Sequence, residues 1–216
     1  MQIQFISKSL IAVLLATQLS ACGILAVGGV AAGASVMADR RTPGVQAIDN
    51  GIEMEANAAL SKRFGDNAHI NVTSFNQKVL LTGEAKDADI KGEAGAYVKA
   101  MKNARTVFNE IVIGPNSTYT ARANDSYLES KIKTQMIFTD KLPSNSMSIV
   151  AEGASVYLMG VLTQNEADLA KKVASNTNGV KDVYVYFDII SDAEKNRLEK
   201  QGKADESQPN SPPKFQ

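Results

Sequence analysis

Two side chains suggest chemistry by their type alone, the single cysteine Cys22 and the single histidine His69. A thiol is a nucleophile, and this one has no second thiol with which to form an intramolecular disulfide. A histidine can act as a general base, but His69 opens an expected strand and no nucleophile-elbow motif accompanies it. One histidine also makes no metal-binding cluster. We therefore expect Cys22 to be chemically modified, and His69 to be an ordinary strand-edge residue.

The acidic residues give no stronger sign of catalysis. Glu84, Asp87 and Asp89 stand close together, and they are most simply a solvated helix start that the helix dipole favours. No glycine-rich phosphate loop follows an expected strand. We expect no enzyme activity, no metal, no cofactor and no small-molecule substrate.

The first 21 residues have the parts of a secretory signal peptide. Lys8 supplies a positive charge, and residues 9–16 (SLIAVLLA) form an apolar run. This run is too short to cross a hydrocarbon core about 30 Å thick, which favours a signal peptide over a transmembrane helix. The small residues Ser20 and Ala21 come directly before Cys22.

The four residues Leu19-Ser20-Ala21-Cys22 resemble a bacterial lipobox. The resemblance implies a diacylglycerol on the Cys22 thiol, cleavage before Cys22, and acylation of the new amine with a fatty acid such as palmitate. Two or three chains hold a protein firmly, since each buried methylene contributes about 0.8 kcal/mol. Gly23 follows the cysteine where inner-membrane lipoproteins often have aspartate, which points to the outer membrane, facing the periplasm. The alternative is an ordinary secretory signal with an incidental cysteine.

The charge of the mature chain argues against nucleic acid as a partner. Lys plus Arg and Asp plus Glu both number 23, and loss of Lys8 with the signal leaves a net charge near −1. Residues 24–37 are apolar and rich in Gly and Ala. This segment is either a flexible leader or a helix-association patch built on Gly29 and Gly33.

The chain contains an internal repeat with an offset of 76 or 77 residues. Residues 79–83 (VLLTG) correspond to 156–160 (VYLMG), and 107–111 (VFNEI) to 183–187 (VYVYF). Apolar positions four apart give the first helix of each repeat. These positions are 52, 56 and 60 in one copy and 128, 132 and 136 in the other. Asn124 and Asp125 are candidate N-caps for the second copy.

Each repeat predicts the order helix, strand, strand, helix, strand. The strands are expected at residues 70–73, 78–82 and 105–113, and at 147–150, 155–159 and 181–190; the second helices are expected at 86–103 and 164–177. The predicted fold class is α+β, with two tandem domains, each a small three-stranded mixed sheet packed by two helices. The expected organisation is a signal peptide at 1–21, a lipidated leader at 22–45, domains at 46–114 and 122–190 joined by a linker at 115–121, and a disordered C-terminal extension at 191–216.

This repeat resembles the BON domain, with Gly83 and Gly160 where that family has its glycine after the second strand. Two such units behind a lipobox, with the Arg40-Arg41-Thr42 motif and residues 105–111, resemble the dual-BON lipoproteins that Gram-negative bacteria use in division and outer-membrane stress. The resemblance implies binding of anionic phospholipid by the second domain, location at division sites, support of outer-membrane integrity, and a link to the barrel-assembly machinery.

The second copy carries the better candidate lipid surface. Tyr127, Lys131, Thr134 and Phe138 fall at i, i+4, i+7 and i+11 and so line one face of a helix. Tyrosine and lysine suit the bilayer interface, and Lys133 could add charge at the rim. The first copy has Gly51, Glu55, Ala58 and Lys62 at the equivalent positions, without an aromatic ring. The alternative is that Tyr127 and Phe138 pack against the other domain.

Two functions remain open. The first is a lipid-binding, scaffolding lipoprotein of the outer membrane that recognises anionic lipids such as phosphatidylglycerol or cardiolipin. The second is a protein-interaction adaptor for an envelope assembly complex, such as the barrel-assembly machinery, without direct headgroup binding.

Overall fold

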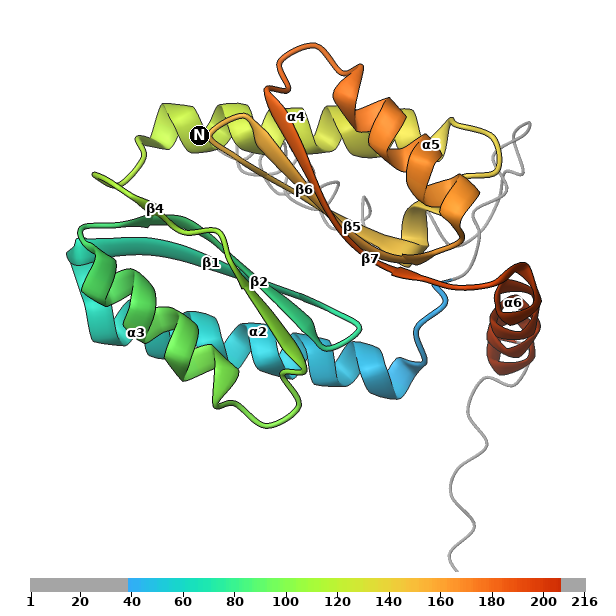
Figure 1. Cartoon of the computed structure of the whole chain (residues 1–216), viewed down its shortest axis with the longest axis horizontal. Coiled ribbons are helices and arrows are strands. Elements are labelled where there is room, and N and C mark those ends of the chain that lie inside the picture. The colour runs from blue at the N-terminus through green and yellow to red at the C-terminus, as the bar shows by residue number, and fades with distance from the viewer. Residues whose placement is uncertain (1–38, 207–216) are drawn as a thin grey trace, which may run out of the picture. The chain divides into compact units, whose positions relative to one another are not determined.

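The computed structural model describes residues 39–206. Cys22, the signal and the leader with Gly29 and Gly33 lie outside the described residues, as do residues 207–216. The described part contains two α+β repeats in sequence (Figure 1). Within residues 39–206 no helix has the length and hydropathy that a membrane span requires.

The first repeat has the expected element order. Its elements are α2 (Pro43–Phe64), the 3₁₀ turn η3 (Gly65–Asn67), β1 (Ala68–Phe75), β2 (Lys78–Ala85), α3 (Ala88–Lys99), β3 (Thr106–Asn109) and β4 (Val112–Ile113). Strand β1 pairs antiparallel with β2, and β3 and β4 both pair parallel with β2. Leu81 lies opposite Asn109 and Glu84 opposite Val112, so the register is the same on both sides of the gap. The strand expected at 105–113 is therefore one strand with an interruption.

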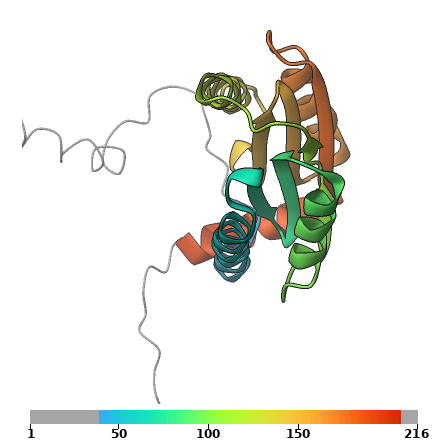
Figure 2. The same ribbon diagram turned by 90° about the vertical axis from the view of Figure 1, so that its left-hand side faces the viewer.

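The second repeat follows the same plan. Its elements are α4 (Tyr119–Ile137), η4 (Ser144–Ser146), β5 (Met147–Glu152), β6 (Ser155–Leu162), α5 (Gln164–Ser175) and β7 (Asp182–Ile189). Strand β6 pairs antiparallel with β5 and parallel with β7. In each repeat both helices cover one face of the sheet. Figure 2 shows α2 and α4 nearly end-on, next to the strands. The predicted fold class is confirmed.

The central strands are apolar on both faces, which gives the described chain three cores. Val79 and Leu81 pack under the helices of the first repeat, whereas Leu80 points to the other side of the sheet. In the second repeat Leu158 packs under the helices and Tyr157 points away. Leu80 and Tyr157 meet in one shared cluster, so the outer faces of the two sheets bury each other. The rings of Phe108 and Tyr186 stack there with centroids 4.0 Å apart.

Both first helices begin where a threonine caps them. The Thr42 hydroxyl accepts from the Val45 N–H, so α2 starts at Pro43. Thr118 caps α4 in the same way through the Ala121 N–H at 3.2 Å. The expectation of an N-cap at Asn124 or Asp125 is wrong, because that part of the chain lies inside the helix.

The C-terminal extension expected to be disordered is helical over α6 (Asp192–Glu206). Its composition is polar, but it is held by ion pairs with the folded repeats. Lys195 contacts Glu166 at 2.8 Å, Glu199 contacts Arg40 at 2.8 Å, and Leu198 packs on the cluster between the sheets. These contacts compensate the low hydropathy that predicted disorder.

The glycine shared by the two repeats has a steric role. Gly83 has φ +104°, and a Cβ there would lie 1.9 Å from the carbonyl oxygen of His69 on the neighbouring strand. A Cβ at Gly160 would lie 2.9 Å from the Ser146 carbonyl oxygen. Any side chain at these positions would push β1 from β2, or η4 from β6.

Candidate membrane-facing surface

The orientation of helix α4 about its own axis is fixed by its buried apolar residues and by a buried aspartate. Leu128, Ile132 and Met136 are buried in the core of the second repeat. The Asp125 carboxylate accepts hydrogen bonds from the N–H groups of Gly153 and Ala154, both at 3.0 Å. Because these contacts anchor α4 to the β5–β6 turn, the opposite face of the helix is presented to solvent.

The predicted stripe lies on that solvent face. Tyr127 is 71% exposed and Phe138 is 77% exposed. The alternative that both rings pack against the first repeat is therefore wrong. Thr134 is exposed between them, and its hydroxyl donates to the Ser130 carbonyl at 2.8 Å. Tyr119 at the start of α4 is also 87% exposed, about two turns before Tyr127.

The two candidate lysines lie on different sides of α4. The Lys131 ammonium donates to the Asn178 carbonyl at 3.0 Å and stays at the surface beside the stripe. Lys133 follows two residues later, so it points to nearly the opposite side of the helix. Its ammonium donates to the Ser144 carbonyl at 2.8 Å, and burial lowers its pKa while Glu129 and Asp39 oppose this effect. The structure therefore brings Tyr127, Lys131, Thr134 and Phe138 together, but not Lys133.

The equivalent face of α2 is chemically different. Gly51, Glu55, Ala58 and Lys62 are all exposed, and none has an aromatic ring. Met54 is the large apolar side chain most exposed on α2, at 75%. The asymmetry between the repeats that the sequence predicts is thus present on two solvent-facing helices.

The chain was compared with known protein families, proteins and structures. The family model of the BON domain matches residues 49–115 and 124–190. The chain belongs to the BON-domain family. A Haemophilus influenzae protein named outer membrane lipoprotein DolP is 30% identical over 174 residues, which cover 80% of this chain and 90% of that protein. A 21 kDa hemolysin of Actinobacillus pleuropneumoniae is 29% identical over 70% of this chain and 79% of its own.

Solved structures add nothing to this assignment. One similar structure is that of CdsD, a structural protein of the type III secretion system of Chlamydia trachomatis. The similarity covers 69% of this chain and 68% of the CdsD chain. The TM-score is 0.27 and the identity is 14%, so this similarity carries no argument.

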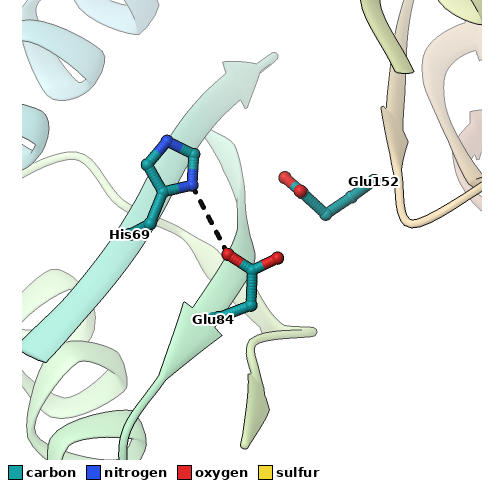
Figure 3. Close-up of side chains that lie close together, drawn as sticks. All are labelled: His69, Glu84 and Glu152. Atoms are coloured by element: carbon teal, nitrogen blue, oxygen red, sulfur yellow. Dashed lines mark ion pairs between the residues drawn. The ribbon is translucent and has the colours of Figure 1, made fainter. Parts of the chain in front are cut away.

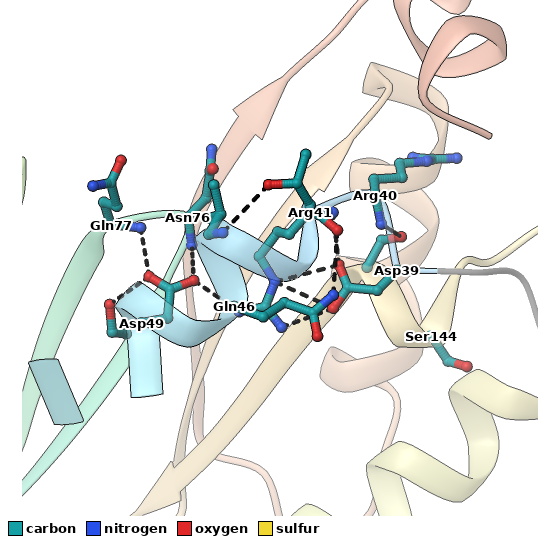
Figure 4. Close-up of polar contacts among 12 residues, drawn as sticks. Asp39, Arg40, Arg41, Gln46, Asp49, Asn76, Gln77 and Ser144 are labelled. Carbon is teal, nitrogen blue, oxygen red and sulfur yellow. Dashed lines mark hydrogen bonds and ion pairs between the residues drawn. The ribbon is translucent and has the colours of Figure 1, made fainter. Parts of the chain in front are cut away.

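Two consecutive arginines, Arg40 and Arg41, tie the start of the described chain to both BON domains, and Figure 4 shows Arg41 with Asp49 of the first domain. The Arg40 guanidinium is buried and donates to both oxygens of Glu166 at 2.7 and 2.9 Å, and to the Val161 carbonyl at 3.0 Å. Arg41 contacts Asp49 of the first domain at 2.9 Å. We call this pair the arginine junction. Sequence reasoning did not identify the arginine junction, because nothing local indicates its distant partners.

Glu166 is the centre of the junction in the second BON domain. Its carboxylate also accepts from the Thr163 N–H at 2.8 Å, completing a capping box at the start of α5. Burial raises the pKa of Glu166, but the hydrogen bonds from Arg40, Lys195 and the Thr163 N–H outweigh it and lower the pKa to about 2. The carboxylate therefore stays ionised although it is buried.

Asp49 performs in the first BON domain the role of Asp125 in the second. It accepts from the N–H groups of Gln77 and Asn76 at 2.7 and 2.9 Å in the β1–β2 turn. Asp49 and Asp125 are 76 residues apart, the offset of the repeat itself. This shared acid is the signal that could have identified both residues from the sequence.

His69 lies at the start of β1, as expected, whereas Glu84 does not lie where sequence reasoning placed it (Figure 3). Glu84 is in β2 and not at a solvated helix start, and its carboxylate lies 3.6 Å from His69 Nδ1 on β1. Glu152 at the end of β5 reaches the same point from the second BON domain. Burial lowers the pKa of His69, Arg122 acts in the same direction, and Glu84 opposes both.

Proposed function

We propose that this protein is a non-enzymatic outer-membrane lipoprotein whose second BON domain binds anionic phospholipid, such as phosphatidylglycerol or cardiolipin. The observation that carries the proposal is the α4 face, where Tyr127 and Phe138 are exposed on either side of Lys131. The lipobox at Cys22 and the name of the Haemophilus influenzae relative support a lipid anchor at the outer membrane, facing the periplasm. The cellular role that we propose is support of outer-membrane integrity, with location at division sites.

The side chains of this face suit an anionic bilayer surface. Each aromatic ring contributes about 1.5–3 kcal/mol if most of it leaves water, and a lysine near an anionic surface contributes about 1 kcal/mol. The Lys131 ammonium has three donors, and the Asn178 carbonyl takes one of them. A lipid phosphate can accept from the others without loss of that bond.

The anchor makes modest affinity sufficient. Residues 22–38 are 17 residues long and span up to about 60 Å when extended. A tether of this length keeps the domain at a high effective concentration near the bilayer. A face with weak intrinsic affinity therefore spends much of its time on the lipid surface.

Vesicle binding of the mature chain without its lipid, made as Cys22→Ser, tests the proposal. We expect binding to phosphatidylglycerol vesicles at low salt and none to phosphatidylcholine vesicles. Lys131→Glu should weaken binding at least tenfold, because it places a like charge at the phosphates. Tyr127→Ala should weaken binding with less effect on its salt dependence.

The matched control is Lys62→Glu, which makes the same charge change on the equivalent exposed face of α2, at the position that corresponds to Phe138. It should change vesicle binding less than threefold. Equal losses from both lysine variants would mean that net charge, and not the α4 face, governs binding. Capture of an envelope assembly complex, such as the barrel-assembly machinery, without any vesicle binding would favour the adaptor function instead.

A further inference from the structure

We propose that His69, Glu84 and Glu152 form a site for a divalent cation of the zinc class that links the two BON domains. This inference is independent of lipid binding, because it concerns another surface of the molecule. Imidazole and carboxylate together are a ligand set that zinc accepts, whereas magnesium and calcium prefer oxygen alone.

The three side chains converge from three strands. His69 on β1 and Glu84 on β2 are direct cross-strand partners, so their side chains leave the same face of the first sheet. Glu152 is the last residue of β5 in the second domain. Figure 3 shows the imidazole and both carboxylates directed at a common point, and one ligand atom from each residue lies within 4.8 Å of the others.

The spacing is close to that of a coordination sphere. With metal–ligand bonds of about 2.0–2.2 Å, neighbouring ligand atoms in a tetrahedral site are roughly 3.3–3.6 Å apart. His69 Nδ1 and Glu84 Oε2 are already 3.6 Å apart. The Glu152 oxygen lies within 4.8 Å of the other two ligand atoms, so it must approach by up to about 1.5 Å, which a rotation of its side chain can supply. A water molecule would complete the fourth position.

The ligand atoms themselves lack other partners. His69 Nδ1 and Glu84 Oε2 are both shielded from solvent and form no hydrogen bond, although buried polar atoms are normally satisfied. Only four side-chain atoms of the described residues are in that condition, and these two face each other. A cation between them would satisfy both.

The second carboxylate is already oriented. Asn71 Nδ2 donates to Glu152 Oε2 at 3.1 Å, which leaves the other oxygen of Glu152 available as a ligand. A hydrogen bond of this kind, made to the atom beside the ligand atom, is typical of protein metal sites. Arg122 lines the same cleft and opposes a cation by charge; its guanidinium donates to the Ser117 carbonyl at 2.7 Å, which fixes its position.

Zinc titration of the mature chain tests the site. The chain carries Cys22→Ser, which also removes the one thiol that could bind zinc. We expect one Zn²⁺ per chain by isothermal titration calorimetry, with a dissociation constant below about 10 µM, that is, more than about 7 kcal/mol of binding free energy. His69→Gln, Glu84→Gln and Glu152→Gln should each weaken zinc binding at least tenfold. Glu129→Gln, in the same cleft but outside the cluster, should change it less than threefold.

NMR spectroscopy with paramagnetic Co²⁺ in place of zinc locates the ion in a chain whose His69, Glu84 and Glu152 are not substituted. Amide resonances near residues 69, 84 and 152 should shift together, in both domains. Absence of zinc binding, equal affinity in the variants and their parent, or shifts centred elsewhere would overturn the site. Weakening by His69→Gln and Glu84→Gln but not by Glu152→Gln would overturn the link between the domains.

Discussion

Replacement of Glu166 by glutamine tests how the arginine junction holds the folded chain together. The variant keeps the size and shape of the side chain but removes the charge that faces Arg40 and Lys195, at 2.7 and 2.8 Å. The Arg40 side chain is only 1% exposed, so solvent cannot replace the lost partner. Removal of one member of a buried ion pair typically costs several kcal/mol for this reason.

The magnitude follows from the pKa of Glu166. Its fall from the ordinary value of 4.5 to about 2 means that ionised Glu166 contributes about 3 kcal/mol to stability near pH 7. The folded pKa is the lower one, so the contribution is complete above about pH 5. It declines as the pH falls toward 2, where the folded carboxyl takes up a proton.

Urea unfolding of the mature chain carrying Cys22→Ser, followed by circular dichroism at pH 7 and pH 2, measures this contribution. Glu166→Gln should lower the free energy of unfolding by about 3 kcal/mol at pH 7 and by less than about 1 kcal/mol at pH 2. The control is Glu93→Gln, which breaks the Arg63–Glu93 pair at 2.7 Å between side chains 55% and 52% exposed. It should cost less than about 1 kcal/mol at either pH. A loss at Glu166 that is small at pH 7, or equal at both pH values, would refute the reasoning.

Two further changes test the anchor and the shared glycine. Cys22→Ala should release the protein from the outer-membrane fraction after a high-salt wash, and persistence in that fraction would contradict the lipid anchor. Gly83→Ala should lower the free energy of unfolding by more than about 2 kcal/mol, because it adds a Cβ at positive φ against the His69 carbonyl. Gly92→Ala in α3, where a Cβ meets nothing, should instead stabilise by up to about 1 kcal/mol, and equal effects in an unfolding titration would contradict the steric argument.

The fold was predictable because its information is local and duplicated. Core positions four apart, apolar strand runs and the glycines at 83 and 160 occur twice at nearly the same offset, so each copy supports the interpretation of the other. The same comparison predicted the stripe on α4. It did not predict the packing of the sheets on each other, although runs such as 79–81 and 156–159, apolar at every position, are typical of strands buried on both faces.

The missed features depend on distant residues. Arg40 pairs with Glu166, which is 126 residues away in the sequence, and with Glu199, which is 159 residues away. No local pattern indicates either pair. The helix over Asp192–Glu206 was missed for the same reason, since its partners lie in other elements. Glu152 joins His69 only because the two BON domains meet. A count of histidines along the chain could not indicate that cluster.

The proposed function separates attachment of the protein to the membrane from its orientation on the bilayer surface. The arginine junction holds the described chain from Asp39 onward, and the charge of the Asp39 carboxylate favours the protonated form of Lys133 in α4. In the function that we propose, lipid on Cys22 would determine whether the protein stays at the membrane, whereas the α4 face would determine which side it turns toward the bilayer. Lys131→Glu should therefore leave membrane fractionation of the lipidated protein intact while removing protection of α4 from hydrogen exchange on anionic bilayers. If Lys131→Glu alone released the lipidated protein, the acyl chains would not be the main attachment, and the division of roles between Cys22 and α4 would be wrong.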